Sequence, residues 1–564
     1  MILVCLSKRG IELHNTPEVR TVNDPVILTL GYADKHPVAE VPLEFSNWGL
    51  LTQVLCCAEK VEVLTDHAGA YPLYFARAAD SIWIGSSAWE VVARAQLQAM
   101  NYAACMEMLA YEFVIGPHTL VEGLEELRPG ILTTFSFESG TWQRSEQIRW
   151  QLEYTGDSKL TLKDRTRLGA EIMHAACAPV VERAQDATSP LALNLSGGWD
   201  SRAVLACLLP LGPQHLFTST YGDETYSGVK IARAASASVG IPHRFFPFSS
   251  GQMLREWFIE LCRALPPVIR FNLADGGYAM SRQLYGATCG VSCGHSGDFF
   301  TGAPFYPADK VKNADQLCAW LKRSMRSAFP RDQLLRILHP KHRDLADAPE
   351  DHLSQTANEV FAPGYTGVLR WKLEHRVRRA AVVELRVLEQ RTPIVYAPLL
   401  HRDFIAFWGT VPPGDLVGQS LYKRILAEQL FTGAARPLAE LPREGGGSVR
   451  EFGPLSKWKG FTRKKIAGLK RRVAPAAAAQ ASAADPTARW WRGDPELRQW
   501  AWQTLQHSPL IAELFDLARL KTLILEQSMS DFPLARIGVW NMLTLAGVEQ
   551  VLRELQSLTR APRD

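Results

Sequence analysis

The sequence has few of the features that mark secreted, membrane-spanning or strongly charged proteins. Its ten cysteines are unevenly spaced and none follows Cys318, a pattern that argues against a disulfide framework or a zinc ribbon in so long a chain. No apolar run is long enough to cross a bilayer, and the apolar start, Met1–Cys5, ends too soon for a signal peptide. The formal charge of +4 gives no electrostatic argument for nucleic acid. We therefore expect a folded cytoplasmic protein whose partners include neither membrane nor nucleic acid.

Length and composition indicate a folded chain of more than one domain. The 564 residues exceed what one core holds, and 47% apolar with 21% charged residues is typical of globular proteins. Up to about residue 150, short alternating runs predict strands at 26–32, 61–64, 72–76, 82–85 and 131–137. From about residue 160, helices alternate with short apolar strands, as in a parallel sheet with crossover helices. We therefore predict an α/β chain, with a β-rich domain over 1–155 and a doubly wound, helix-rich domain over 156–564.

The most informative segment is the loop of residues 196–201, with the sequence SGGWDS, which we call the first loop. It lies between the apolar run 191–195 and a helix-like stretch, 202–209. Two glycines let backbone N–H groups approach an anion, two serines add hydroxyl donors, and the helix directs its positive end at the same place. Asp200 would repel a bare phosphate, which implies a divalent cation such as Mg²⁺. The strand–loop–helix context favours a pyrophosphate-binding loop over an ordinary turn. The residues predicted to bind nucleotide here are Leu195, Ser196, Gly197, Gly198, Asp200 and Ser201.

The segment that follows predicts further residues at the same edge of the sheet. Leu195 and Phe217 are spaced for one βαβ unit, which continues with a helix over 225–239 and a strand over 243–248. Ligands in doubly wound folds bind beyond the carboxyl ends of the strands. We therefore expect the run after Phe217 to lie beside the first loop. Its members are Thr218, Ser219, Thr220 and Tyr221.

A second glycine-rich loop, Gly294–Gly302, follows the strand-like segment Ala287–Cys293 and is called the second loop. If the two strands are neighbours, Asp298 and Asp200 can hold one Mg²⁺–triphosphate between them. His295 then lies on the substrate side. Taken alone, such a loop is as easily an ordinary turn, and a lone histidine is more often structural than a base. Gly294 and Gly297 are also predicted to contact the nucleotide.

These motifs resemble those of the asparagine synthetase superfamily, the ATP pyrophosphatases of the PP-loop type. The first loop is similar to the family's SGGxDS loop, and GHSGDFFTG is similar to its GxGxDE segment. Lys423 resembles the lysine of the family's KxxLR helix, although the final arginine is absent. A further family segment fits two registers, one with Glu389 and Arg391 and the other with Tyr396 and Pro398. The catalytic residues implied are Lys423, His295 and Glu389.

The N-terminal part resembles a glutaminase domain. The segment Asp66–Tyr74, DHAGAYPLY, is similar to the strand pair DxxGxxPLYY, and Thr119–Gly130 is similar to the end of that domain. Glutamine-using members expose a cysteine after the initiator, whereas this sequence begins Met-Ile-Leu, and Cys5 has no free amine beside its thiol. The resemblance therefore implies a degenerate glutaminase-like domain, an Ntn-type α+β sandwich without an ammonia supply, ahead of the synthetase domain.

Without ammonia, the amine is expected to come from the substrate itself, which points to β-lactam synthetases, carbapenam synthetase and lasso peptide cyclases. Residues 293–298, Cys-Gly-His-x-Gly-Asp, are similar to some lasso cyclases, while Phe299 replaces the usual glutamate. We predict a ligase that uses ATP and Mg²⁺ to adenylate an Asp or Glu side chain of a precursor peptide and closes a macrolactam with the peptide's N-terminal amine. A leader peptidase and a leader-binding protein are further expected partners.

Other interpretations stay open at this stage. A small-molecule amide ligase, or an asparagine-synthetase-like amidotransferase of the same superfamily, would use the same loops and lysine. A catalytically silent scaffold would keep only the fold. The basic stretch 457–472 is either a solvated helix face or a docking surface for an acidic peptide, and the alanine-rich run at about 473–488 predicts a flexible insertion.

Overall fold

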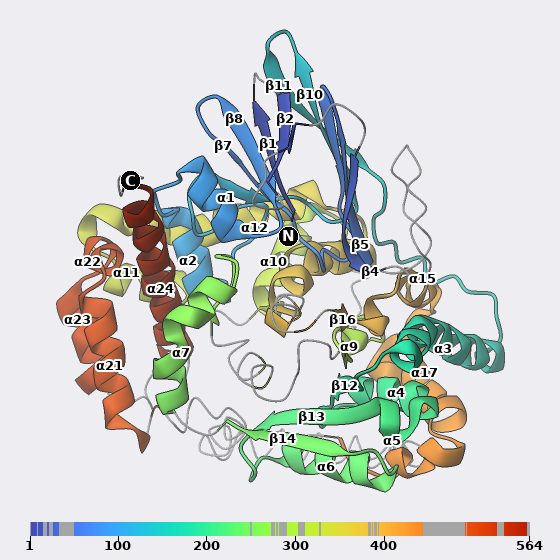
Figure 1. Cartoon of the computed structure of the whole chain (residues 1–564). Helices are drawn as coiled ribbons and strands as arrows, with labels where there is room; N and C mark the ends of the chain where they lie inside the picture. Colours follow the sequence, from blue (N-terminus) through green and yellow to red (C-terminus); the bar gives the residue numbers. More distant parts are fainter. Residues whose placement is uncertain are drawn as a thin grey trace.

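The structure is a computed structural model, whose described residues form three β-sheets together with many helices, and the N-terminal strands project from one end (Figure 1). Glu389, Arg391, the basic stretch 457–472 and the predicted insertion 473–488 lie outside the described residues. The residues that the structure describes are 2–7, 10–14, 20–21, 26–32, 50–248, 251–271, 277, 280, 290–302, 311–325, 329–381, 385, 387–388, 392, 394–443, 491, 493–526 and 535–560.

Two antiparallel sheets make up the N-terminal region and pack face to face. Their orders are β3-β2-β1-β8-β7-β9 and β11-β10-β6-β5-β4. Every second residue of β1, Val4 and Leu6, shares one core cluster with Val54 and Phe135 of the other sheet, as expected for a sandwich. The predicted β-rich region is confirmed. The strands are β1 (Leu3–Ser7), β2 (Gly10–Leu13), β3 (Arg20–Thr21), β4 (Val26–Tyr32), β5 (Leu50–Cys57), β6 (Lys60–Leu64), β7 (Tyr74–Arg77), β8 (Ser81–Gly85), β9 (Leu124–Glu126), β10 (Ile131–Glu138) and β11 (Thr141–Ile148).

The third sheet is parallel throughout, with the order β14-β13-β12-β15-β16. Its central strand pairs Leu193 with Thr218 on one side and with Ser292 on the other. The chain builds β12, β13 and β14 in one direction and then returns to place β15 on the far side of β12, so the strand order reverses between β12 and β15. The predicted parallel sheet is confirmed. Its strands are β12 (Leu191–Asn194), β13 (Leu216–Gly222), β14 (His243–Pro247), β15 (Val291–Cys293) and β16 (Val395–Tyr396).

Helices cover both regions, and one large core cluster joins them, with members from Leu3 to Leu552. Within the described ranges, no helix combines the length and apolarity needed to cross a bilayer. The helices are α1 (Ala88–Ala95), α2 (Tyr102–Tyr111), α3 (Leu162–Asp186), α4 (Trp199–Leu208), α5 (Gly212–His215), α6 (Ser227–Ser238), α7 (Gly251–Ala264), α9 (Gly297–Phe300), α10 (Ala314–Ser324), α11 (Arg331–Ile337), α12 (Ala348–Glu359), α13 (Tyr365–Trp371), α15 (Arg402–Thr410), α16 (Pro413–Leu416), α17 (Ser420–Ile425), α21 (Pro495–Gln506), α22 (Pro509–Leu514), α23 (Leu517–Lys521) and α24 (Ala535–Arg560), and a π-helical segment, Lys372–Ala381, follows α13.

The N-terminal sheets are tied to the later chain by buried polar contacts. Glu126, at the end of β9, pairs with Arg378 at 3.2 Å and with Arg379, both on the π-helical segment. His67 is fully enclosed and its Nε2 lies 2.8 Å from the carbonyl oxygen of Leu400. These contacts hold the two N-terminal sheets, which we call the front sheets, against the helices that follow the parallel sheet.

Candidate active site

A cavity of about 370 Å³ lies at the carboxyl ends of three neighbouring parallel strands, where the strand order reverses. This is the position at which open α/β sheets bind ligands, and the volume suits a small organic ligand. Its lining residues are Asn194, Leu195, Ser196, Gly197, Ser201, Ser219, Thr220, Tyr221, Tyr226, Gly228, Val229, Met280, Cys293, Gly294 and His295.

The first loop is held by its own serine hydroxyls. Ser201 Oγ accepts a hydrogen bond from the backbone N–H of Ser196 at 3.0 Å, and the two serine hydroxyls lie 2.9 Å apart. Gly198 is the N-cap of α4 and offers no side chain to its first turn. The N–H groups of that turn therefore lack a side-chain cap and are available to an anion.

Arg202 anchors the first loop through hydrogen bonds to backbone carbonyl oxygens. Its guanidinium is fully buried and donates to the carbonyl oxygens of Gly198 at 2.9 Å, Leu441 at 3.0 Å and Pro442 at 3.2 Å. A single side chain thus ties the loop to the chain segment that follows Leu438.

The second loop meets the first through their acidic residues. The backbone N–H of Asp298 donates to Asp200 Oδ2 at 2.7 Å. A Cβ on Gly297 would lie 2.8 Å from Asp200 Cγ, and one on Gly294 would lie 2.5 Å from the Ser201 nitrogen, so only glycine allows this approach. Ser296 between them has a φ of 64°, in the left-handed region that a serine rarely adopts, which is typical of functional loops.

Burial changes the titration of this pair. Burial, and then the nearby Asp298 carboxylate, raise the pKa of Asp200 to about 7, against the lowering effects of Tyr422 and Arg443. Loss of water contacts also raises the pKa of Asp298. Two carboxylates in this state are suited to a divalent cation. Its positive charge would balance the negative charge that the described residues offset only in part.

Helix α17 contributes two further residues to the site. Tyr422 is fully buried and donates its hydroxyl to Asp200 Oδ1 at 2.8 Å. Its neighbour Lys423 is half-buried, with its Nζ 5.3 Å from the ring centre of Trp199, the first residue of α4. Arg443 lies over the same ring at 4.5 Å. Two cations therefore gather beside the first loop, and one indole orients both.

The structure brings most of the predicted site residues together, but not all. Thr218 is buried earlier on β13, with its hydroxyl 2.7 Å from Ser236 Oγ and 2.8 Å from His243 Nδ1, and it is not among the residues that line the cavity. Of the two candidate registers, Tyr396 forms β16 and Pro398 follows it, while Glu389 and Arg391 lie outside the described residues.

Several contributors escaped the sequence prediction. Arg202, Tyr422 and Arg443 lie near the first loop in space but carry no recognisable motif, although Tyr422 is adjacent to Lys423 on α17. The cavity-lining residues that were not predicted are Asn194, Tyr226, Gly228, Val229, Met280 and Cys293. Proximity of this kind comes from the packing of distant segments, so it is not visible in local patterns.

The N-terminal motifs have a structural explanation in this geometry. The Asp66 carboxylate is buried and accepts from the N–H groups of Ala68 at 3.0 Å, Ala70 at 2.9 Å and Tyr71 at 2.8 Å. Cys5 is enclosed in the middle of β1, where burial and then Glu12 raise the pKa of its thiol to about 11. Asp66 therefore shapes a turn, and the Cys5 thiol is a poor nucleophile at neutral pH.

Comparison with known proteins adds a family match. Among solved structures, glutamine phosphoribosylpyrophosphate amidotransferase from B. subtilis, complexed with ADP and GMP, is similar at 12% identity and a TM-score of 0.12, over 45% of this chain and 44% of that one. This likeness spans less than half of the other chain, and at that identity and TM-score it indicates neither fold nor function. No curated protein matches. Residues 178–430, which include both loops and α17, match the asparagine synthase family model, and this match supports an ATP-dependent, amide-bond-forming enzyme of the asparagine synthetase superfamily.

Proposed function

We propose that the chain is an AMP-forming peptide macrolactam synthetase of the lasso cyclase type, working with ATP and Mg²⁺ in the cytoplasm. It would adenylate the side-chain carboxylate of an Asp or Glu in a precursor peptide and close a ring with the N-terminal amine of the same peptide. A leader peptidase and a leader-binding protein would deliver that peptide.

One observation carries the nucleotide half of this proposal. Asp200 and Asp298 come from loops after adjacent parallel strands and touch beside the cavity, next to the uncapped first turn of α4. Their oxygens are the ligands that Mg²⁺ prefers, and the turn offers N–H groups to phosphate oxygens. When bound, Mg²⁺ supplies positive charge to the phosphates, and Asp200 and Asp298 would hold it there.

The chain's own residues then divide the work. A peptide carboxylate attacks the α-phosphorus of ATP and pyrophosphate leaves toward the first loop, whose hydroxyl and N–H donors stabilise its charge. The amine nitrogen next attacks the acyl carbon and AMP leaves, with Lys423 balancing the negative charge that develops there. His295, at the cavity wall, accepts the proton that the amine gives up. A free α-amine has a reference pKa of about 7.7–8.0, so a weak base suffices.

The choice of an internal amine follows from the front sheets and from sequence similarity. Cys5 lies within strand β1, and its preceding peptide bond leaves it no free amine. Residues 293–298 are similar to lasso cyclases. Both features favour an amine that arrives with the substrate over ammonia released from glutamine.

The test is to incubate the full chain with ATP, Mg²⁺ and a leader-cleaved precursor peptide, and to measure product mass and nucleotide. We expect loss of one water from the peptide with stoichiometric AMP. Formation of ADP, or an amide gained only when ammonia is added, would overturn the proposal. Pyrophosphate exchange into ATP without ring closure on any peptide would favour a small-molecule ligase, and no exchange at all a silent scaffold.

Matched variants separate the two steps. Asp200→Asn and Asp298→Asn should each lower pyrophosphate exchange by about a hundredfold or more, because each removes a carboxylate that would hold Mg²⁺ on the phosphates. His295→Ala should slow ring closure more than exchange. Equal slowing of both steps would show that His295 has a structural role.

A further inference from the structure

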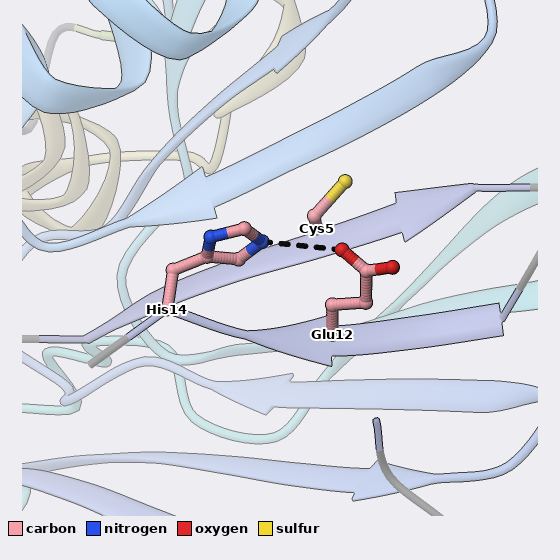
Figure 2. Close-up of side chains that lie close together, drawn as sticks. All are labelled: Cys5, Glu12 and His14. Atoms are coloured by element: carbon pink, nitrogen blue, oxygen red, sulfur yellow. Dashed lines mark ion pairs between the residues drawn. The ribbon is translucent and has the colours of Figure 1, made fainter. Parts of the chain in front are cut away.

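A second group of potential ligands lies far from the parallel sheet, on the hairpin of β1 and β2. Cys5 pairs with Glu12 across the hairpin, and the N–H of His14 donates to the carbonyl oxygen of Leu3 at 2.9 Å, which continues the same register. Because side chains alternate along a strand, Cys5, Glu12 and His14 project from one face. Figure 2 shows the His14 imidazole and the Glu12 carboxylate directed toward one another, with the Cys5 side chain beside them.

The separation of the nitrogen and oxygen atoms suits a tetrahedral metal ion, and the sulfur lies nearby. The thiol sulfur, one carboxylate oxygen and one imidazole nitrogen all lie within 4.8 Å of one another. His14 Nε2 lies 3.4 Å from Glu12 Oε2. A tetrahedral ion with bonds of about 2.0–2.1 Å to nitrogen and oxygen would place those two atoms about 3.3–3.4 Å apart. The hairpin thus holds the pair at the separation that such an ion requires.

The surroundings of the His14 imidazole also favour a cation. Its Nε2 is buried and, within the described part of the chain, makes no hydrogen bond, although Glu12 lies near it. The ring is fixed by Trp83 of β8, whose centroid is 5.0 Å away, and only 11% of the His14 side chain is exposed. A buried ring nitrogen without a hydrogen bond is costly, and a cation held between it and Glu12 would satisfy it.

We propose that Cys5, Glu12 and His14 form a zinc site with three protein ligands, leaving the fourth position to water. A mixed set of sulfur, nitrogen and oxygen donors favours Zn²⁺ over Mg²⁺ or Ca²⁺, which prefer oxygen alone. On binding, the S–H bond of Cys5 breaks as the sulfur–zinc bond forms, and the proton passes to water. The ion would join β1 to the end of β2 across the hairpin. This inference depends only on the front sheets and not on the proposed function.

The test uses the untagged full chain and two metals, each added alone. Zn²⁺ is titrated in competition with a chromophoric chelator, and Co²⁺ is followed by absorption, since a cobalt–thiolate bond gives a sulfur-to-metal charge-transfer band. We expect one tight Zn²⁺ per chain and a clear band with Co²⁺. The band distinguishes this site from Asp200 and Asp298, which contain no sulfur.

Three variants decide the matter. Cys5→Ser should abolish the cobalt band and weaken zinc binding by more than about a hundredfold, beyond the 10–100-fold lost when an outer-shell partner is removed. Glu12→Gln, whose side chain is 33% exposed, preserves the fold if Cys5→Ser does not, and should weaken binding at least about tenfold. Cys57→Ser, a half-buried cysteine on β5, is the matched control and should change nothing. An absent cobalt band in the unmodified chain, or unchanged affinity in Glu12→Gln, would overturn the proposal.

Discussion

At the scale of single residues, Asp200 combines burial, two hydrogen bonds and a neighbouring carboxylate. It accepts hydrogen bonds from the Asp298 backbone and the Tyr422 hydroxyl, yet burial and the Asp298 carboxylate raise its pKa to about 7. The charged form is therefore costly until a cation arrives. This makes the ionisation of Asp200 measurable through stability as well as through activity.

We expect the stability of the metal-free chain to reveal this ionisation. The folded-state pKa lies above the value of about 3.9 in an unfolded chain, so the contribution of Asp200 is fully present below about pH 4 and is lost as the pH rises through about 7. Asp200→Asn has no charge to lose and should gain stability relative to the unmodified chain over that range. The measurement is the free energy of unfolding of both chains, in chelator, against pH.

Two further arms of this experiment are diagnostic. Saturating Mg²⁺ should remove the advantage of Asp200→Asn above about pH 7, since the ion stabilises the carboxylate. Tyr422→Phe removes a donor that lowers the Asp200 pKa, so the loss of stability should end at a higher pH. An identical difference between the two chains at every pH would contradict the assigned pKa.

Local chemistry made some of these residues predictable and left others hidden. Asp200 and Asp298 lie in glycine-rich loops after apolar strands, a pattern that the sequence displays directly. Tyr422 and Arg443 contact the same site from other segments, and only tertiary packing selects them. Thr218 illustrates the reverse problem: it belongs to the run predicted to bind nucleotide, but it lies earlier on β13 than the cavity-lining Ser219, Thr220 and Tyr221, and its hydroxyl contacts Ser236 and His243.

At the scale of secondary-structure elements, the first loop and α4 depend on the segment near Leu441. Arg202 lies one turn into α4 and donates to carbonyl groups of that segment and to Gly198. The elements themselves were largely predictable: β12 lies within the apolar run 191–195, and the sequence expectation of a helix over 225–239 corresponds to α6. The π-helical segment after α13, which carries Arg378 and Arg379, was not predicted.

We expect Arg202→Met to destabilise the chain by about 2–4 kcal/mol, because the part-buried hydrogen bonds to Gly198, Leu441 and Pro442 are lost at about 0.5–1.5 kcal/mol each. Methionine retains most of the side-chain volume, so the loss reports the hydrogen bonds more than packing. Chemical denaturation measures the effect, and pyrophosphate exchange should show weaker ATP binding. Arg167→Met on α3 is the control, since Arg167 forms only an exposed pair with Glu171. Equal effects of the two substitutions would rule out the proposed anchoring.

At the scale of the whole molecule, the front sheets and the parallel-sheet region share a core and a buried ion cluster. Glu126 is 2% exposed and Arg379 is fully buried, and the two meet across the junction. The sequence suggested two regions from the change in hydrophobic pattern near residue 150. It gave no sign of this junction, because a lone Glu and an Arg pair occur on many surfaces.

We expect Glu126→Gln to destabilise the folded chain by about 3–5 kcal/mol, because two buried guanidinium groups lose their counter-charge. The neighbouring Glu125→Gln is the matched control. Glu125 pairs with Arg144 at 3.1 Å near the surface, so its loss should cost about 1 kcal/mol or less. Thermal unfolding of both variants measures the difference. Comparable shifts in the two would contradict a structural role for the Glu126 cluster.

The C-terminal helix α24 has a consequence for how this protein is made. It lies beside α2 and α7 (Figure 1), and Asn541 donates to the carbonyl oxygen of Leu109, which is 432 positions earlier. During synthesis, α2 therefore gains this neighbour only after nearly all of the chain has been translated. The apolar surface of α2 that α24 later covers stays open during that interval, so we expect chaperones to have access to it during synthesis.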